Sequence, residues 1–184
     1  MVDRLNHAAD DRPVLLRPPA RSDEDQARHA HEELAEEGFE FLLDLRDGEP
    51  WTAYVDRSDR QRRGIDMPAG WVPATFFIAD VEGQVVGRVS IRHELNAFLA
   101  EFGGHIGYAV RPAFRRRGYA TAILLQSLQT ARSLGIEQAL VTCDVDNVGS
   151  AKVIEKCGGV FEGVATGRDG ITDRRRYWID CTVG

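Results

Sequence analysis

The chain has 184 residues, of which 43% are hydrophobic, 29 are acidic and 23 are basic, and its formal net charge is −6. This length corresponds to one compact domain, and the acidic balance argues against general nucleic-acid binding, which needs a surplus of Lys and Arg along the phosphate backbone. No membrane-spanning run or signal peptide is visible, so we expect a cytoplasmic protein, and three cysteines without a C-x-x-C pair predict neither a disulfide framework nor a metal site.

The first half of the chain predicts a leader, one strand and two helices. The expected division of the chain is a flexible leader and a single domain, residues 1–12 and 13–184. The strand and the two helices are expected at residues 14–17, 22–38 and 51–63. A diproline, Pro18-Pro19, ends the strand. Ser22 is a good N-cap with acidic residues in the turn after it, and Gly38 ends the first helix.

The second half predicts strands interrupted by two further helices. Strands are expected at residues 75–79, 85–91, 105–110, 138–143, 160–165 and 176–181, and helices at residues 118–134 and 148–157. Glu82-Gly83 forms a turn between the first two of these strands, which predicts a hairpin. Pro112 must end the third strand because proline cannot donate to a ladder, and Gly135 ends the longer helix.

The segment before the longer helix has the composition of a phosphate-binding loop. Its residues are Arg115, Arg116, Arg117, Gly118, Tyr119, Ala120 and Thr121. A helix N-terminus presents unpaired N–H donors and the positive end of the helix dipole, so a pyrophosphate can bind there mainly through backbone amides. Gly118 and Ala120 allow the phosphates to approach closely. Because neither Gly-Lys-Ser/Thr nor G-x-G-x-x-G is present, the loop is neither a Walker loop nor a dinucleotide fingerprint.

These residues resemble the acetyl-CoA signature of the GNAT superfamily of N-acetyltransferases. The resemblance rests on Arg-x-x-Gly-x-Ala at residues 115–120, at a helix start, and on Asn147-x-x-Ser150 one strand later. It implies an α+β, three-layer fold, in which a single mixed, mostly antiparallel sheet is flanked by helices. It also implies a V-shaped splay between the strands at residues 105–110 and 138–143, with acetyl-CoA as the co-substrate.

The same resemblance implies how the cofactor is held. The main-chain groups of Tyr108, Ala109 and Val110 would pair with the pantetheine amides as an added strand does. Asn147 and Ser150 would line the pantetheine arm, and the pyrophosphate would lie on the phosphate-binding loop. The reaction is then direct attack of a neutral amine on the thioester, with an acid for the leaving thiolate.

The sequence departs from the family pattern at the catalytic positions. Many members carry a tyrosine acid where this chain has Ile154, and an acidic residue or histidine on the strand face where this chain has Gly104 and Ile106. Tyr108 shares that face and has a hydroxyl, although a strand tyrosine is commonly a packing residue. Asp144, just after a strand, could orient an ammonium or accept its proton, with a turn-and-cap role as an equal alternative. Tyr108 and Asp144 are therefore the candidate catalytic residues.

Other polar residues have ordinary explanations. His105 has the wrong parity for the cofactor slot, so a core or opposite-face position is expected. Cys143 has no histidine partner that the sequence places, and direct transfer needs no such nucleophile. An acidic patch on the first helix could draw a cationic amine or be an exposed helix face. It consists of Glu32, Glu33, Glu36 and Glu37.

The leading function is acetyl transfer from acetyl-CoA to a primary amine of a small molecule, a peptide N-terminus or a lysine. The alternative is a non-catalytic module of the same fold that binds acyl-CoA as a sensor or partner subunit. Membranes and nucleic acids are not expected partners, and the quaternary state is open, with a homodimer as the commonest closed assembly. No motif identifies the amine, because acceptor specificity in this fold comes from the first helices and the last hairpin.

Overall fold

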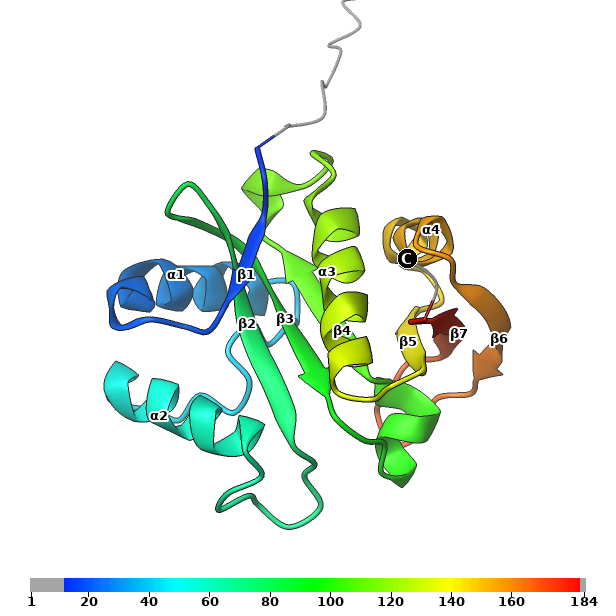
Figure 1. Cartoon of the computed structure of the whole chain (residues 1–184), viewed down its shortest axis with the longest axis horizontal. Helices are drawn as coiled ribbons and strands as arrows, with labels where there is room; N and C mark the ends of the chain where they lie inside the picture. The colour runs from blue at the N-terminus through cyan, green and yellow to red at the C-terminus, as the bar shows by residue number, and fades with distance from the viewer. Residues whose placement is uncertain (1–11, 183–184) are drawn as a thin grey trace, which may run out of the picture.

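The computed structural model describes residues 12–182 and shows a seven-stranded sheet with helices on both faces (Figure 1). The strands are β1 (Leu15–Arg17), β2 (Ala74–Val81), β3 (Gln84–Arg92), β4 (Ile106–Val110), β5 (Gln138–Asp144), β6 (Val160–Ala165) and β7 (Arg174–Asp180). The helices are α1 (Glu24–Ala35), α2 (Trp51–Arg62), α3 (Tyr119–Ser133) and α4 (Val148–Lys156). The leader expected at residues 1–12 lies, except for residue 12, outside the described residues.

The sheet is mixed and mostly antiparallel, as the sequence predicts. Its strand order is β1-β2-β3-β4-β5-β7-β6, and every adjacent pair is antiparallel except β4 with β5. The chain therefore forms the β2–β3 hairpin and adds β4 beside it. It then crosses over through α3 to the parallel strand β5, as a parallel connection requires.

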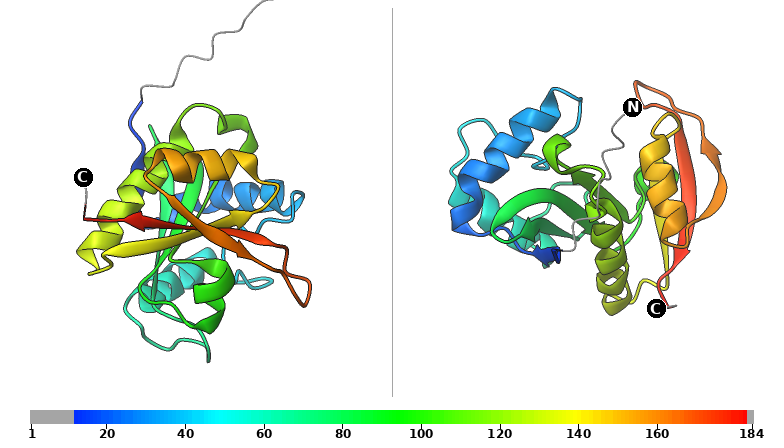
Figure 2. Two further views of the ribbon diagram at one scale, coloured as in Figure 1. Left: turned by 90° about the vertical axis from the view of Figure 1, so that its right-hand side faces the viewer. Right: turned by 90° about the horizontal axis from the view of Figure 1, so that it is seen from above.

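Different helices cover the two faces of the sheet. One apolar cluster joins α1 and α2 to the sheet, and its fully buried members include Ala30, Leu34, Tyr54 and Ile78. The other cluster joins α3 and α4 to the opposite face through Ile123, Leu124, Val141 and Ile154. In Figure 2, α1 lies at one side of the molecule and α4 lies beside β6 and β7 at the other. Because side chains alternate along a strand, neighbouring residues of β3 and β4 point to different clusters.

The junction between β4 and β5 is short. The two strands register at Ile106 and Val141. Just before this pair, the His105 amide donates to the Leu140 carbonyl oxygen at 2.7 Å, and the Leu140 amide donates to His105 Nδ1 at 2.9 Å. Gly104 has a φ of 66°, and a Cβ there would lie 2.6 Å from the Leu140 carbonyl oxygen, so only glycine fits. The amino-terminal end of β4 is thus joined to the middle of β5, and His105 is the buried structural residue that parity predicts.

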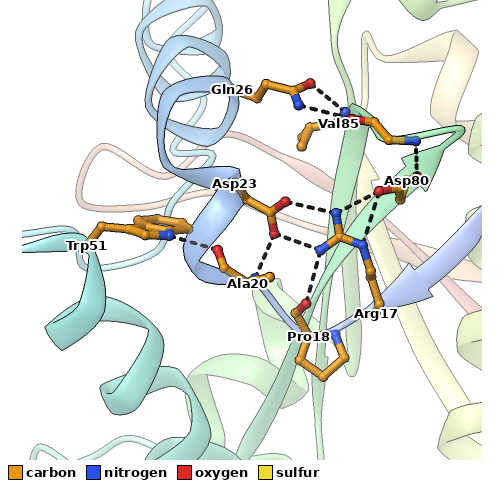
Figure 3. Close-up of polar contacts among 9 residues, drawn as sticks. Arg17, Pro18, Ala20, Asp23, Gln26, Trp51, Asp80 and Val85 are labelled. Atoms are coloured by element: carbon orange, nitrogen blue, oxygen red, sulfur yellow. Dashed lines mark hydrogen bonds and ion pairs between the residues drawn. The ribbon is translucent and has the colours of Figure 1, made fainter.

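The start of the first helix differs from the sequence expectation. Ser22 does not cap α1, because it lies within a 3-10 turn that precedes the helix. The neighbouring carboxylate of Asp23 accepts from the Ala20 amide at 2.7 Å and binds both Nη atoms of Arg17, at 2.7 and 2.8 Å. Arg17 also contacts Asp80 at 2.6 Å, which links β1, the turn and β2 (Figure 3). Asp80 is distant from Arg17 in the sequence, so local capping rules do not reveal this link.

Most other boundaries match within a few residues, with two informative exceptions. β7 begins at Arg174, two residues earlier than predicted, because it pairs along its whole length with β5. A π-helical turn, Leu99–Gly103, was not predicted, and its Phe102 carbonyl accepts from Thr142 Oγ1 of β5 at 2.6 Å. Among residues 12–182, no helix has the length and apolar character needed to cross a bilayer.

Candidate active site

The loop before α3 has the backbone geometry of an anion-binding turn. Gly118, the N-cap of α3, has a left-handed φ of 87°, and Arg116 has a φ of 64°. The Ala122 amide makes the first bond of the helix, to the Gly118 carbonyl oxygen at 3.1 Å. The amides of the first turn, including those of Ala120 and Thr121, consequently have no acceptor within the helix. These donors and the positive end of the helix dipole suit an anion, and the phosphate site at this loop stays a prediction.

The arginine side chains of this region are mostly engaged with the protein. Arg115 makes a two-point contact with Glu37, just after the end of α1, at 3.0 and 2.5 Å, and Arg111 binds Glu33 of α1 at 2.8 Å. Arg117 donates to a carbonyl oxygen in the preceding turn at 3.0 Å. Two of the four glutamates in the expected acidic patch are therefore ion-paired, and α1 is tied to the phosphate-binding loop.

Tyr119 and Thr121 differ in what they offer a cofactor. The Tyr119 side chain is 2% exposed and packs in the cluster of α3 and α4, so its contribution to a phosphate site is confined to the main chain. Thr121 is partly exposed, and its carbonyl oxygen lies 3.9 Å from Cys157 Sγ at the end of α4. The start of α3 therefore faces α4 closely.

A polar chain connects β4 with the first turn of α4. The Tyr108 hydroxyl lies 2.9 Å from Ser150 Oγ, and the Ser150 amide donates to the Asn147 side chain at 2.9 Å. Asn147 is the N-cap of α4. Burial raises the pKa of Tyr108 to about 12, so its hydroxyl is protonated at neutral pH. Sequence motifs named all three residues, and the structure brings them into one hydrogen-bonded chain.

The two other positions considered for acid–base chemistry have different surroundings. Ile154 is fully buried in the α3 and α4 cluster, one helical turn beyond Ser150. Asp144, at the end of β5, lies 3.3 Å from Nη1 of Arg174 and accepts a hydrogen bond from Thr172. Both Asp144 oxygens are thus engaged with the segment that leads into β7.

The histidines and the cysteine near these strands are accounted for by packing. His93 Nε2 lies 2.9 Å from Thr75 Oγ1, and His105 Nδ1 is occupied by the Leu140 amide. Burial lowers the pKa of both histidines, which favours their neutral forms. Burial raises the pKa of the Cys143 thiol, which disfavours the thiolate that a nucleophile needs. No group of three or more potential metal ligands occurs within the described part of the chain.

A cavity of about 450 Å³ lies on the opposite face of the sheet, the face that α1 and α2 cover. Its lining includes Ser90 and Arg92 of β3, and Trp71, Asn96 and Phe98 from the loops beside them. Sequence reasoning missed Arg92 as a site residue. The available signal is the alternation Arg88, Ser90, Arg92, which places a polar stripe on one face of an otherwise apolar strand.

Comparison with known proteins identifies the family. The sequence model of the Acetyltransferase (GNAT) family matches residues 42–159, which is more than half of the chain. The chain therefore belongs to the GNAT family. It is an acetyl-CoA-dependent N-acetyltransferase, as the sequence motifs predict. A comparison with curated proteins found no match.

Several solved structures share the fold at low sequence identity. The microcin C7 self-immunity acetyltransferase MccE, in complex with acetyl-CoA and AMP, has 18% identity over 94% of both chains, with a TM-score of 0.64. Mycobacterium smegmatis RimJ, in complex with CoA-disulfide, has 21% identity over 91% of this chain and 81% of its own, with a TM-score of 0.65. YncA from Salmonella typhimurium, a putative acetyltransferase with acetyl-CoA, has 13% identity over 93% and 95%, with a TM-score of 0.62.

Proposed function

We propose that residues 13–184 act as a single catalytic domain that transfers the acetyl group of acetyl-CoA to a primary amine by direct attack. The observation that carries this proposal is the contact between Tyr108 and Ser150, 2.9 Å apart. This contact lies between β4 and the first turn of α4, and the Tyr108 hydroxyl is protonated at neutral pH. Solved structures of the same fold contain acetyl-CoA, which supports the assignment of the co-substrate.

The cofactor would be held by backbone groups at both ends. Its diphosphate would accept hydrogen bonds from the amides at the start of α3, where Gly118 leaves open space around its Cα. Its pantetheine amides would pair with residues 108–110 of β4 as an added strand does. The single β4–β5 register pair, Ile106 with Val141, supports this placement because the strands make no further pairs towards their carboxyl ends in residues 12–182. We propose that they splay into the V-shaped slot there.

The chemical step needs a donor for the leaving sulfur. The amine nitrogen forms a bond to the thioester carbon, the carbon–sulfur bond breaks with its electron pair on sulfur, and the amine proton passes to solvent. We propose that the Tyr108 hydroxyl donates a hydrogen bond to the sulfur as its negative charge develops. Asp144 would position the segment before β7 through Thr172 and Arg174 rather than take the amine proton.

Two measurements test this function. Release of free thiol from acetyl-CoA is followed with a panel of primary amines, and acetylated products are identified by mass spectrometry. Binding of acetyl-CoA is measured separately by calorimetry. Thiol release that depends on an amine and yields an N-acetyl product is expected. Tight cofactor binding without thiol release for any amine would contradict the proposal and favour an acyl-CoA-binding module.

A further inference from the structure

Two arginines of β3 lie on the face of the sheet opposite Tyr108. Arg88 is 3% exposed, and its Nη atoms donate to two carbonyl oxygens, those of Gly107 at 2.8 Å and Glu40 at 2.9 Å. Its guanidinium carbon lies 4.6 Å from the ring centroid of Phe39, and its Nε has no hydrogen-bond partner. Arg92, two residues further along the strand, lines the 450 Å³ cavity. Two positive charges thus share this part of the sheet.

Neither guanidinium forms an ion pair with a carboxylate of the described chain. Two carboxylate residues, Glu40 and Asp44, also line the cavity. The Glu40 carboxylate influences Arg88 through space and accepts from the Asp44 amide at 2.8 Å, and the Asp44 carboxylate pairs with Arg57 at 3.1 Å. Burial lowers the pKa of Arg88 to about 9, with a further contribution from the charge of Arg92, and burial lowers the pKa of Arg92 to about 10. A buried cation without a counter-charge destabilises the fold, so an anion bound beside these groups would stabilise the protein.

The neighbouring strand leaves room for this arrangement. A Cβ on Gly107 of β4 would lie 2.9 Å from Nη1 of Arg92, so a side chain at this position would displace the guanidinium. Gly107 directly precedes Tyr108, and the two residues point to opposite faces of the sheet. Arg92, which lines the cavity, therefore lies close to the strand that presents Tyr108. Its rim carries two large exposed aromatic residues, Trp71 at 40% and Phe98 at 53% exposure.

We infer that the amine acceptor carries an anionic group, a carboxylate or a phosphate, and that Arg92 binds this group in the cavity with Arg88 behind it. The inference rests on the proposed acetyl transfer and names its substrate class. A guanidinium presents a planar pair of donors that matches both carboxylate and phosphate. The cavity has the size of a small-molecule site, and Trp71 and Phe98 offer apolar surface to the rest of the acceptor.

Matched acceptor pairs test the charge requirement. One pair is an L-amino acid and its amide, and the other is phosphoethanolamine and ethanolamine. We expect kcat/KM to be about tenfold to a hundredfold higher for the anionic member of at least one pair, the range expected for hydrogen bonds to a charged group. The pair that shows the preference identifies the anion. Equal kcat/KM values within both pairs would overturn the inference.

The variant Arg92→Met tests whether Arg92 recognises the negative charge of the acceptor. It should raise KM about tenfold or more for the anionic acceptor and leave the neutral one little changed. Its thermal midpoint should equal or exceed that of the parent, because a half-buried cation without a carboxylate partner is removed. The matched control is Arg62→Met, which removes an exposed arginine of α2 and should leave the preference intact. A lower midpoint for Arg92→Met, with both acceptors affected equally, would show a purely structural role and refute the inference.

Binding without turnover separates this inference from the proposed function. Inorganic phosphate, compared with chloride at equal ionic strength, should raise the thermal midpoint of the parent more than that of Arg92→Met, because phosphate binding at the start of α3 is common to both proteins. If no amine is acetylated and this phosphate effect is present, the proposed function fails and the anion site stands. If neutral amines are acetylated as fast as anionic ones and phosphate raises the midpoints of the parent and Arg92→Met equally, the inference fails and the proposed function stands.

Discussion

Replacing Tyr108 with phenylalanine isolates the hydroxyl that we place beside the leaving sulfur. The ring is kept, so packing against the α3 and α4 cluster is preserved. The lost interaction is one 2.9 Å hydrogen bond to Ser150. In the free protein this change should lower the free energy of unfolding by only about 1 kcal/mol, the usual net value of a neutral hydrogen bond.

The effect on catalysis should be larger, because the acceptor in the transition state is charged. The pKa of Tyr108 is raised to about 12, whereas an ordinary thiol has a pKa of about 8.5. Complete proton transfer from the hydroxyl to the thiolate is therefore uphill by about 3.5 units, or about 5 kcal/mol. A hydrogen bond without full transfer contributes about 1.5–3 kcal/mol. We expect kcat to fall roughly 10- to 150-fold, with the KM for acetyl-CoA nearly unchanged.

Steady-state thiol release across acetyl-CoA concentrations measures both constants. The matched control is Tyr177→Phe, because Tyr177 is also fully buried and its hydroxyl donates to Glu155 of α4 at 3.2 Å. That control should change stability by a similar amount and leave kcat unchanged. A Tyr108→Phe enzyme with kcat within twofold of the parent, or a control that loses as much activity, would refute the assignment of Tyr108 as the donor.

Three further results are expected. Arg17→Met should lower the free energy of unfolding by about 3 kcal/mol in a urea titration, because it leaves the buried carboxylates of Asp23 and Asp80 without their cation. Burial alone would raise the pKa of Asp23, but the hydrogen bonds from Arg17 and the Ala20 amide and the charge of Arg17 together hold this pKa below its ordinary 3.8. The stabilisation is therefore complete above pH 3.8 and is lost as the pH falls below it. Arg17→Met should flatten the acid limb of the stability curve, and an unchanged limb would contradict the assignment. Gly118→Asp should bind acetyl-CoA at least about tenfold more weakly than the isosteric Gly118→Asn in calorimetry, since both side chains tolerate the left-handed φ and only the aspartate repels a diphosphate; equal affinities would argue against the phosphate site. Cys143→Ala should retain kcat, whereas loss of activity without loss of folding would indicate a covalent route.

The fold was predictable where local rules decide it. Helix periodicity and stop residues such as Gly38 and Gly135, both left-handed in the structure, located the helices to within a few residues. The strand order could not be predicted from the sequence, since no local sequence pattern indicates that β7 inserts between β5 and β6. The Ser22 cap was predicted wrongly because Arg17, which the distant Asp80 also binds, fixes the carboxylate of Asp23 within the 3-10 turn before α1.

The candidate site was likewise predictable only where a local sequence pattern marks it. The start of α3 and the Asn147–Ser150 turn were visible because main-chain geometry at a helix start leaves a sequence pattern. The partner of Tyr108 was not visible, because the contact with Ser150 depends on how α4 packs against β4. Arg88 and Arg92 were missed because an arginine in a strand is ordinarily solvated, and only the structure shows that they lack carboxylate partners.

The distribution of charge strengthens the case for an anionic acceptor. The chain has 29 acidic and 23 basic residues, so carboxylates are in excess. They pair with arginine at the structural positions, as Glu33 does with Arg111 and Glu37 with Arg115. Because carboxylates are in excess, a shortage of acidic residues does not explain why Arg88 and Arg92 lack a carboxylate partner. A neighbouring carboxylate would stabilise the fold and occupy the guanidinium that an anionic acceptor needs, so the unpaired arginines fit a site whose counter-charge arrives with the substrate.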